Sequence, residues 1–465
     1  PTRSLARPTT GRACTALWTA VAAVTQTGSI LLTDSMDDSM RSAMAAEAGT
    51  VHAPAPATLR LGRITVALSI WLPLAIFALT RLYGVVVIAI AARHQVALPS
   101  PDHPGIYQFT PHPDSPGYLG LITNWDGQWY ERIATDGYHL PASGDPHGKD
   151  ALNAFAFLPV FPMMVGAMMT VTGLGFAVCA TILNLVAGGA AMVVMFALVE
   201  RTAGRFAASA TVLFTCCFVA APLLQAAYSE SISVLLVCTI LLLLTRRRYR
   251  WAVAAVVLLS LTRLVTPPLA IVVIVHAALR LRHRAQDPIR RGEAIWMTVL
   301  AVVSVVSVSF WSTITTTITS GVKATGADRG NVSSAVGAAR FGWFTNASEH
   351  IGWIGVVGLV LLVVLFVALA LSPMTRTWGV EVRTWFAIYP IFLLFVAGVH
   401  TGTFRYLLLA FPLALLMVGS PEPGTVPRRR ATLVMVVCLI SLALQAPWVS
   451  HALVVTPAAG KPWLP

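Results

Sequence analysis

Residues 351–371 read IGWIGVVGLVLLVVLFVALAL, a run without a charged or strongly polar side chain. A helix needs about 20 apolar residues to cross a hydrocarbon core of roughly 30 Å. The run is continuously apolar and does not alternate, so it indicates a membrane helix rather than a strand of a membrane barrel. The stretch predicts an all-α polytopic membrane protein.

Similar runs occur along the rest of the chain, which has 465 residues, of which 56% are hydrophobic and only 11% charged. Soluble domains are about 25% charged, so the composition agrees with a membrane protein. We expect eleven crossings in all, with the N-terminus inside and the C-terminus outside. Besides 351–371, the predicted spans are 64–92, 176–199, 208–225, 229–245, 251–262, 264–279, 295–318, 384–399, 404–420 and 431–449.

The net charge of +13 is distributed as short arginine clusters between the apolar runs. Cytoplasmic connections of membrane proteins carry such an excess of basic residues, so we interpret the charge as topology. No basic groove with interleaved aromatic residues is present, and we therefore expect membrane lipids rather than nucleic acid as partners. The clusters expected on the cytoplasmic side contain Arg201 and Arg205, Arg246 to Arg250, Arg280 to Arg291, Arg376 and Arg383, and Arg428 to Arg430.

The chain divides into two regions just before the first span. Residues 1–60 are expected to be a poorly ordered N-terminal segment, and residues 61–465 a single multi-span membrane domain. The first outer loop, residues 94–175, ends in an apolar stretch at 155–171 that contains Pro159 and Pro162. A full crossing there would place the later arginine clusters outside. We therefore predict that 155–171 lies at the outer interface or dips into the membrane and returns.

An acidic residue lies among aromatic residues in this loop. The stretch contains Trp125, Asp126, Gln128, Trp129 and Tyr130. Aromatic rings pack on the CH groups of a sugar, and a carboxylate can accept a hydroxyl proton as a general base. An interfacial belt of tryptophan and tyrosine with an incidental aspartate explains the stretch equally well.

A second polar stretch, Tyr228-Ser229-Glu230-Ser231, lies between two apolar runs. Glu230 could hydrogen-bond a sugar hydroxyl or neutralise an arginine. Alternatively, Ser229 and Glu230 cap a helix and occupy its first turn, where acidic groups are favourable. The two roles are compatible.

Two arginines lie at the ends of predicted spans on the outer side. Arg263 interrupts a long apolar stretch, and Arg405 follows a short polar segment. A charge at membrane depth is costly and is usually functional, and guanidinium groups suit phosphate through paired hydrogen bonds. The alternative is that both side chains snorkel to the interface.

The cysteine and histidine residues do not have the spacing of metal ligands, and we predict neither a metal site nor another cofactor. Whether the reaction uses a divalent cation is left open. Five of the six cysteines lie inside apolar runs, which favours small core residues over disulfides. The residues concerned are Cys14, Cys179, Cys216, Cys217, Cys238 and Cys438, with His139, His147, His350 and His400 on the outer side.

Four motifs, in this order, resemble those of the PIG-V type mannosyltransferases, which include the second mannosyltransferases of GPI-anchor synthesis and their bacterial relatives. The similarity covers about residues 64–412, and the motifs end near residue 268. They are Trp125-Asp126 with Gln128-Trp129-Tyr130, Ile133-Ala134 with Gly137-Tyr138, Phe155 to Pro162, and Tyr228 to Ser231.

The resemblance implies a GT-C-type fold with a catalytic acid in the first outer loop and an interfacial helix after it. It implies an inverting transfer of a sugar, typically mannose, from a polyprenyl-phosphate donor to a lipid or glycan acceptor. Family members often have proline directly after the arginine, whereas Leu264 follows Arg263 here, and Leu158 replaces the second phenylalanine of a doublet. Both departures leave the sugar, with glucose and arabinose as rivals, and the acceptor open.

Together these arguments assign roles to nine residues and predict a multi-pass protein, in the plasma membrane if bacterial, with an extracytoplasmic site. A transporter or flippase is the alternative, although we find no internal repeat of the kind such proteins show. A membrane scaffold is a further alternative, but it would not need these polar residues. The roles are Asp126 as catalytic base, Trp125, Gln128, Trp129, Tyr130, Tyr228 and Glu230 in substrate binding, and Arg263 and Arg405 in donor-phosphate binding.

Overall fold

The computed structural model describes residues 58–61, 64–98, 111–140, 152–319, 341–399, 402–419 and 427–455. The predicted N-terminal segment 1–60 therefore lies outside the described residues, except for its last three. In the described part the fold is helical apart from one antiparallel strand pair, β1 (Thr58–Leu61) and β2 (Ile64–Ala67), and an isolated antiparallel bridge between Leu98 and His112. The first predicted span begins at residue 64, but its first four positions form β2, because three of them are β-branched and favour an extended backbone.

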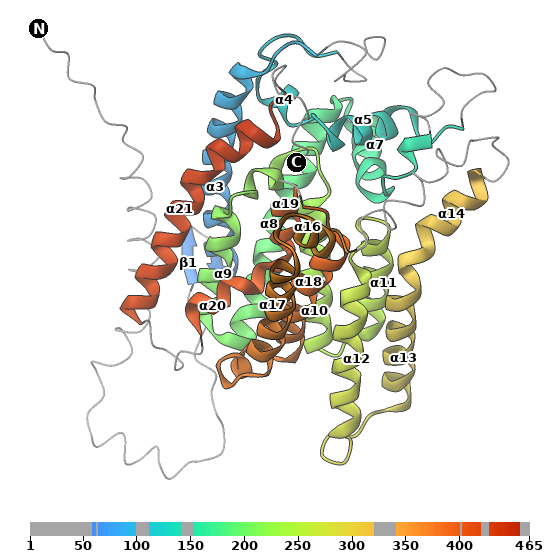
Figure 1. Ribbon diagram of the computed structural model, residues 1–465, viewed down its shortest axis with the longest axis vertical. Helices are drawn as coiled ribbons and strands as arrows, with labels where there is room; N and C mark the ends of the chain where they lie inside the picture. Colours follow the sequence, from blue (N-terminus) through green and yellow to red (C-terminus); the bar gives the residue numbers. More distant parts are fainter. Residues whose placement is uncertain are drawn as a thin grey trace, which may run out of the picture.

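The helices and 3₁₀ turns follow in chain order (Figure 1). They are α3 (Leu68–Ala91), η1 (Ala92–His94), α4 (Gly117–Leu121), α5 (Asp126–Asp136), α7 (Val160–Thr172), α8 (Phe176–Ala203), α9 (Arg205–Cys217), η2 (Ala221–Gln225), α10 (Glu230–Thr245), α11 (Tyr249–Ser260), α12 (Thr266–Arg282), α13 (Arg291–Val306), η3 (Ser307–Ser309), α14 (Phe310–Thr319), α16 (Gly342–Ile351), α17 (Trp353–Leu371), η4 (Pro373–Trp378), α18 (Val380–Val396), α19 (Thr403–Tyr406), η5 (Leu407–Ala414), α20 (Leu415–Val418) and α21 (Arg428–Ala452).

Five helical segments of the described chain are long and apolar enough to cross a membrane, and they make the protein an integral membrane protein. They are Leu68–His94, Phe176–Ala203, Arg291–Thr319, Trp353–Leu371 and Arg428–Ala452. Each coincides with one of the eleven predicted spans. The remaining six crossings stay predictions.

Several of the other predicted spans are shorter or broken. Residues 208–225 form α9 and η2, and residues 404–420 form α19, η5 and α20, with non-helical dihedral angles at Ala410. Pro222 and Pro412 lie in the two 3₁₀ segments, where the missing backbone N–H removes a helical hydrogen bond. The stretch 155–171 contains all but the last residue of α7, whose 13 residues extend about 20 Å, less than the roughly 30 Å of a hydrocarbon core.

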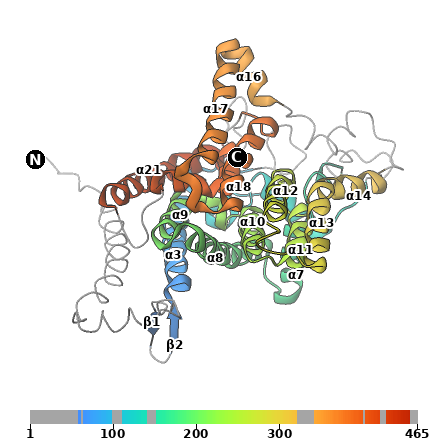
Figure 2. The same cartoon turned by 90° about the horizontal axis from the view of Figure 1, so that it is seen from below.

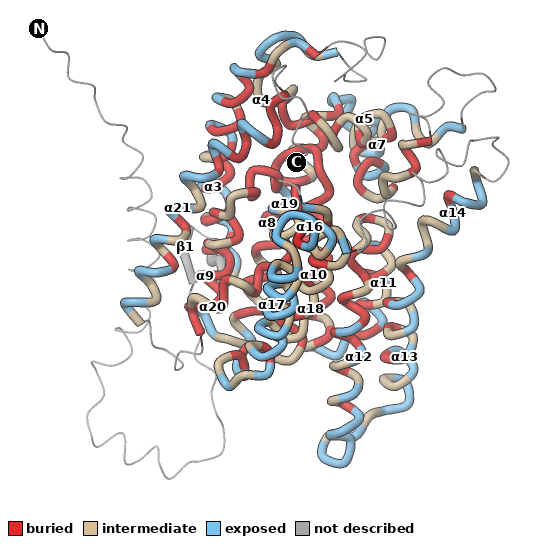
Figure 3. Tube along the Cα trace, viewed as in Figure 1, coloured by how far each residue is buried: buried red, intermediate tan, exposed pale blue. Residues whose placement is uncertain are grey.

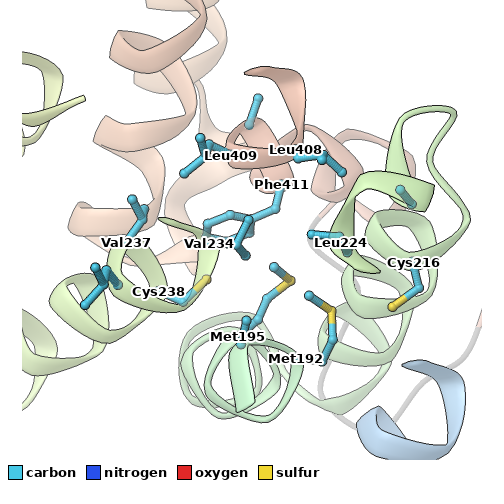
Figure 4. Close-up of a cluster of buried hydrophobic side chains, with 14 of the residues drawn as sticks. Met192, Met195, Cys216, Leu224, Val234, Val237, Cys238, Leu408, Leu409 and Phe411 are labelled. Carbon is cyan, nitrogen blue, oxygen red and sulfur yellow. The ribbon is translucent and has the colours of Figure 1, made fainter. Parts of the chain in front are cut away.

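The core forms around α8, which packs against α3, α9 and α10. Figure 3 shows buried residues concentrated where these helices meet, and exposed residues along α17 and the outer side of α13. The close-up in Figure 4 shows Met192 and Met195 of α8 facing Val234 of α10 and Phe411 of η5. Broken segments such as η5 are therefore held by side-chain packing in the interior.

Helix α17 has almost no buried face, since Ala370 is the only one of its residues that is buried. Figure 2 shows α16 and α17 projecting beyond the rest of the bundle. A helix that is apolar all round and exposed along its length is suited to contact with lipid. This agrees with the membrane interpretation of residues 351–371.

The bundle has two chemically different ends. Helix α10 extends about 24 Å from Glu230 to Thr245 and connects them. At the lower end in Figure 1, the connections after α10 and α12 are joined by ion pairs of Asp287 with Arg247 and Arg280, both at 2.5 Å. We call this the basic end. The opposite end, where α5, α7 and α19 meet the start of α10, is called the site end.

Candidate active site

A cavity of about 390 Å³ opens at the site end. Its polar wall comes from the start of α5, the start of α10, the connection between α11 and α12, and α19. Its apolar wall comes from the segment before α7, from the end of the α11–α12 connection and from the last turns of α18. The polar lining consists of Asp126, Tyr130, Ser229, Glu230, Thr262, Arg263, Tyr389, Arg405 and Tyr406, and the apolar lining includes Phe157, Leu158, Leu264, Val265, Phe392, Leu393 and Val396.

Asp126 is the first residue of α5, and the backbone directly before it is strained. Trp125 has φ = +58° and ψ = −114°, outside the regions that residues with a Cβ normally adopt. Such a conformation costs about 1–3 kcal/mol and persists only where the surroundings hold it. The surrounding fold must therefore hold Trp125 in this conformation, directly before the Asp126 carboxylate.

Asn124 supplies much of that restraint. Its fully buried side-chain amide donates to Gln95 Oε1 at 3.1 Å and to the Leu453 carbonyl oxygen at 2.8 Å. Its own carbonyl oxygen accepts a hydrogen bond from the Tyr228 hydroxyl at 3.0 Å. The loop before Asp126 is thus attached to three segments that are distant from it along the chain.

Two carboxylates and two guanidinium groups alternate along the polar wall. Arg405 Nη1 lies 2.5 Å from Asp126 Oδ2, and Arg263 Nη1 lies 2.9 Å from Glu230 Oε1. Arg405 Nε is 3.8 Å from the same Glu230 oxygen. The charges therefore form one connected network of zero net charge.

This network is largely shielded from solvent. The Glu230 side chain is 1% exposed, the two arginine side chains are 12% exposed, and Asp126 is 28% exposed. The snorkelling alternative is wrong for Arg263 and Arg405, because both point inward to carboxylates. Within the described chain, Glu230 Oε2 and Arg405 Nε have no hydrogen-bond partner, an arrangement that is rare in buried positions and calls for an explanation.

Tyr406 lies against both arginines. The guanidinium carbons of Arg263 and Arg405 are 5.0 and 5.2 Å from the centre of its ring, and Arg405 is also 5.7 Å from the Tyr228 ring. The Tyr389 hydroxyl donates to the Tyr406 carbonyl oxygen at 2.8 Å. Cation–π contacts of this kind hold the guanidinium planes in place.

Sequence reasoning missed Tyr389 and Tyr406 as lining residues. Tyr406 directly follows Arg405, so adjacency could have revealed it. Tyr389 lies inside the apolar helix α18, where nothing in the sequence separates it from a core residue.

The aromatic residues of α5 have different positions. Tyr130 lines the cavity and packs edge-on against Phe157 and Phe161, with ring centres 5.4 and 4.9 Å apart. Burial, reinforced by the Asp126 carboxylate, raises the pKa of the Tyr130 phenol above its ordinary value, so its hydroxyl keeps its proton. Trp129 stacks on Phe157 at 5.5 Å and braces this wall without lining the cavity.

Three further predicted binding residues, Trp125, Gln128 and Tyr228, are not in the cavity lining. Tyr228 instead lies beneath Arg405 and is buried. Trp125 and Gln128 are half-buried on either side of Asp126. Thus the structure brings five of the nine predicted residues together around one cavity, namely Asp126, Tyr130, Glu230, Arg263 and Arg405.

Ser229 occupies the N-cap position of α10, as predicted, but its side chain makes no capping hydrogen bond. Glu230 lies in the first turn, where its charge is favourable to the helix dipole. Its carboxylate is also paired with Arg263, so the helix-start and ion-pair roles coexist in one residue.

The residues considered as metal ligands are dispersed. In the part of the chain that the structure describes, no three histidine, cysteine or acidic side chains form a group able to hold a metal ion. His147, His400 and Cys14 lie outside the described residues. The five described cysteines are free and buried, as expected of core residues.

No family model matches the sequence, and no curated protein matches it. Among solved structures, the chain is similar to the oligosaccharyltransferase of Archaeoglobus fulgidus in complex with zinc and sulfate, with 13% identity and a TM-score of 0.40. A second structure of that enzyme, tethered to an acceptor peptide with the NVT sequon, matches with 12% identity and the same TM-score. The matches cover 82% and 83% of this chain but only 54% and 56% of the other, so the chain spans about half its length.

Proposed function

We propose that the protein is a membrane glycosyltransferase of the GT-C class. It transfers a sugar, with mannose as the sugar implied by the motif resemblance, from a polyprenyl-phosphate donor to a lipid or glycan acceptor. The reaction inverts the anomeric configuration and takes place on the extracytoplasmic side of the membrane.

One observation carries the proposal: Asp126, Glu230, Arg263 and Arg405 meet at a cavity that is polar on one wall and apolar on the other. Its volume of 390 Å³ lies within the range of about 300–1,000 Å³ of small-molecule sites. The arginines suit a phosphate, the carboxylates suit sugar hydroxyls, and the apolar wall suits the first part of a lipid chain. A transporter would not require a partly buried carboxylate paired with an arginine beside an apolar wall.

The chemical step needs one base. Asp126 takes the proton of the acceptor hydroxyl as that oxygen forms a bond to the anomeric carbon. The bond between the anomeric carbon and the phosphate oxygen breaks on the opposite face, and the lipid phosphate leaves with the electron pair. Arg263 and Arg405 stabilise the charge that develops on it, a preorganised electrostatic contribution.

The ion pairs of the site suggest how the base is released. Asp126 Oδ2 is held at 2.5 Å by Arg405 Nη1, so the carboxylate is already engaged before a donor binds. A donor phosphate competes with Asp126 for the same guanidinium group. Donor binding therefore frees the carboxylate for the acceptor, which favours an order in which the donor binds first.

The test is donor consumption by purified full-length protein in detergent. Polyprenyl phosphates carrying mannose, glucose or arabinose are supplied singly, with a membrane lipid extract as acceptor, and labelled product is followed. The variant Asp126→Asn is compared with Asp136→Asn as its matched control, because Asp136 is exposed at the far end of α5 and does not line the cavity. We expect one donor to be consumed by the wild type and by this control.

Consumption of none of the donors would overturn the glycosyltransferase proposal. Movement of an intact lipid-linked sugar across proteoliposomes without bond cleavage would instead support a flippase. Consumption of the glucose or arabinose donor alone would leave the enzyme class in place and reject mannose.

A further inference from the structure

A second cavity, of about 500 Å³, lies at the basic end, on the opposite side of the bundle from the candidate active site. It is formed where the end of α10, the last turns of α12 and the start of α18 come together. Its lining residues are Thr245, Arg247, His276, Leu279, Arg280, His283, Asp287, Val380, Glu381 and Arg383. None of them takes part in the proposed transfer reaction.

The floor of this cavity is a buried hydrogen-bonded group. His276 Nδ1 lies 2.7 Å from Glu381 Oε1, and His276 Nε2 lies 2.9 Å from the Tyr249 hydroxyl. The His276 side chain is 8% exposed and that of Arg280 is 9% exposed. Because these side chains are locked in place, the cavity is a built feature rather than a gap between mobile surface residues.

The arginines of the cavity differ in how they are neutralised. Asp287 bridges Arg247 and Arg280, and the hydrogen bond from Arg247 lowers the pKa of its carboxyl group, which keeps it charged. Arg280 also contacts Glu293 at 2.8 Å, yet its buried Nε finds no partner among the described residues. The Arg383 side chain makes no hydrogen bond or ion pair with any residue that the structure describes.

The surroundings add to the positive field. The connections 246–250 and 280–293 carry nine arginines against two acidic residues, Asp287 and Glu293. Salt in open water screens the attraction between such charges and an anion, but a cavity bordered by protein screens that attraction far less. An anion at this end would therefore be attracted to the cavity.

Aromatic residues mark the level of a membrane interface at the same end. Trp251 lies in the first turn of α11 and is 57% exposed, and Trp296, in the first turns of α13, is 44% exposed. Exposed tryptophans at helix ends characteristically lie at the headgroup level of a bilayer. Leu279 and Val380 add apolar surface to the cavity itself. We therefore expect the anion at this site to be attached to an apolar group, such as the acyl chains of a lipid.

From this geometry we propose that the basic-end cavity binds the phosphodiester of an anionic phospholipid headgroup, with Arg383 as its principal ligand and His283 as a further donor. The anionic leaflet that faces the cytoplasm supplies such lipids, and basic pockets between helices are suited to them. The proposal is independent of the transfer reaction, because the two cavities lie about the length of α10 apart, some 24 Å.

Native mass spectrometry of the delipidated full-length protein tests this. The protein is mixed with equal amounts of phosphatidylglycerol and phosphatidylcholine that have identical acyl chains, and the bound lipids are counted. We compare the wild type with Arg383→Gln and with the matched control Arg376→Gln. Arg376 is exposed at the same end and does not line the cavity. Thermal unfolding of each variant shows whether it is folded.

We expect the wild type to prefer phosphatidylglycerol, Arg383→Gln to lose that preference by about fivefold or more, and Arg376→Gln to keep it. Equal binding of the two lipids by the wild type would overturn the proposal. An equal loss of the preference in Arg383→Gln and Arg376→Gln would also overturn it, because the preference would then depend on the total positive charge of this end and not on the cavity. In a parallel titration, displacement of phosphatidylglycerol by low-millimolar inorganic phosphate would assign the cavity to free phosphate and reject the lipid.

Discussion

At the scale of single residues, the two carboxylates of the candidate site differ in their exposure and in the number of arginines near them. Asp126 is 28% exposed and has one close arginine, whereas Glu230 is 1% exposed and lies near two. A carboxylate that is buried and held by two arginines is hard for an acceptor hydroxyl to reach, while the more exposed one can be released by a competing anion. This contrast assigns the base to Asp126 and a structural or substrate-orienting role to Glu230.

Asp126→Asn is therefore expected to reduce transfer by about 10²–10⁴-fold, the usual contribution of a general base, while expression and donor binding stay near those of the wild type. Product formation from labelled polyprenyl-phosphate sugar in membranes measures the rate, and retention of labelled donor measures binding. Near-wild-type transfer would refute the assignment of the base.

Replacement of Arg263 tests the phosphate role. The simple Arg263→Ala change should raise the apparent KM for the donor, but it also leaves Glu230 buried without its closest partner, which destabilises a protein by several kcal/mol. The double variant Arg263→Ala/Glu230→Gln removes that complication.

In the double variant we expect a donor KM raised about tenfold or more, because a hydrogen bond to a charged group contributes roughly 1.5–3 kcal/mol. Glu230→Gln alone is the control. Steady-state kinetics with varied donor and fixed acceptor provide the measurement. If only the acceptor dependence changed, Arg263 would not be a phosphate ligand.

At the scale of elements, the site depends on how closely α5 lies on α7. Gly166 of α7 faces the Ala134 carbonyl oxygen of α5, and a Cβ at position 166 would lie only 2.8 Å from that atom. Helix α5 carries Asp126 at its start, and α7 follows the segment that forms the apolar wall. A small residue at this crossing thus sets the distance between the two walls of the cavity.

Gly166→Ala should force α5 and α7 apart and lower stability by about 1–3 kcal/mol, the usual effect of overpacking. The matched control is Gly358→Ala in the exposed helix α17, where an added Cβ would meet no atom of the described chain within 4 Å. Thermal unfolding in detergent compares the two. An equal or higher midpoint for Gly166→Ala would show that the contact is not limiting.

At the scale of the whole molecule, the separation of charge between the two ends predicts the orientation in the membrane. The basic end carries the arginine-rich connections after α10 and α12, and the site end carries α5 and the candidate active site. Basic connections stay in the cytoplasm, so the site end should face the extracytoplasmic side.

Single cysteines can report this orientation. In a background with Cys14 replaced by serine, the remaining native cysteines are buried and should react slowly. We expect Thr135→Cys, at the exposed end of α5, to react with a membrane-impermeant maleimide in intact cells, and Gln286→Cys, in the α12–α13 connection, to react only after the membrane is disrupted. The reverse pattern would place the candidate site in the cytoplasm and exclude the proposed donor orientation.

The sequence by itself determined the membrane class and its main helices, because a run such as 351–371 is stable only as a helix in lipid, whatever its neighbours are. It also singled out Asp126, because this acidic residue lies among aromatic residues in the first outer loop, and Glu230, Arg263 and Arg405, because they are the charged residues at the outer ends of predicted spans. Local composition was sufficient for both inferences.

Only the tertiary structure decided how these charges pair and what surrounds them. The partners Asp126 and Arg405 are separated by 279 positions in the chain, and Asn124 and Leu453 by 329, so no local pattern could have revealed either contact. The broken helices 208–225 and 404–420 and the lining role of Tyr389 depend on packing against α8, α10 and α18. Hydrophobicity is a property of a segment, whereas a site is a property of the distances between segments, and folding alone sets those distances.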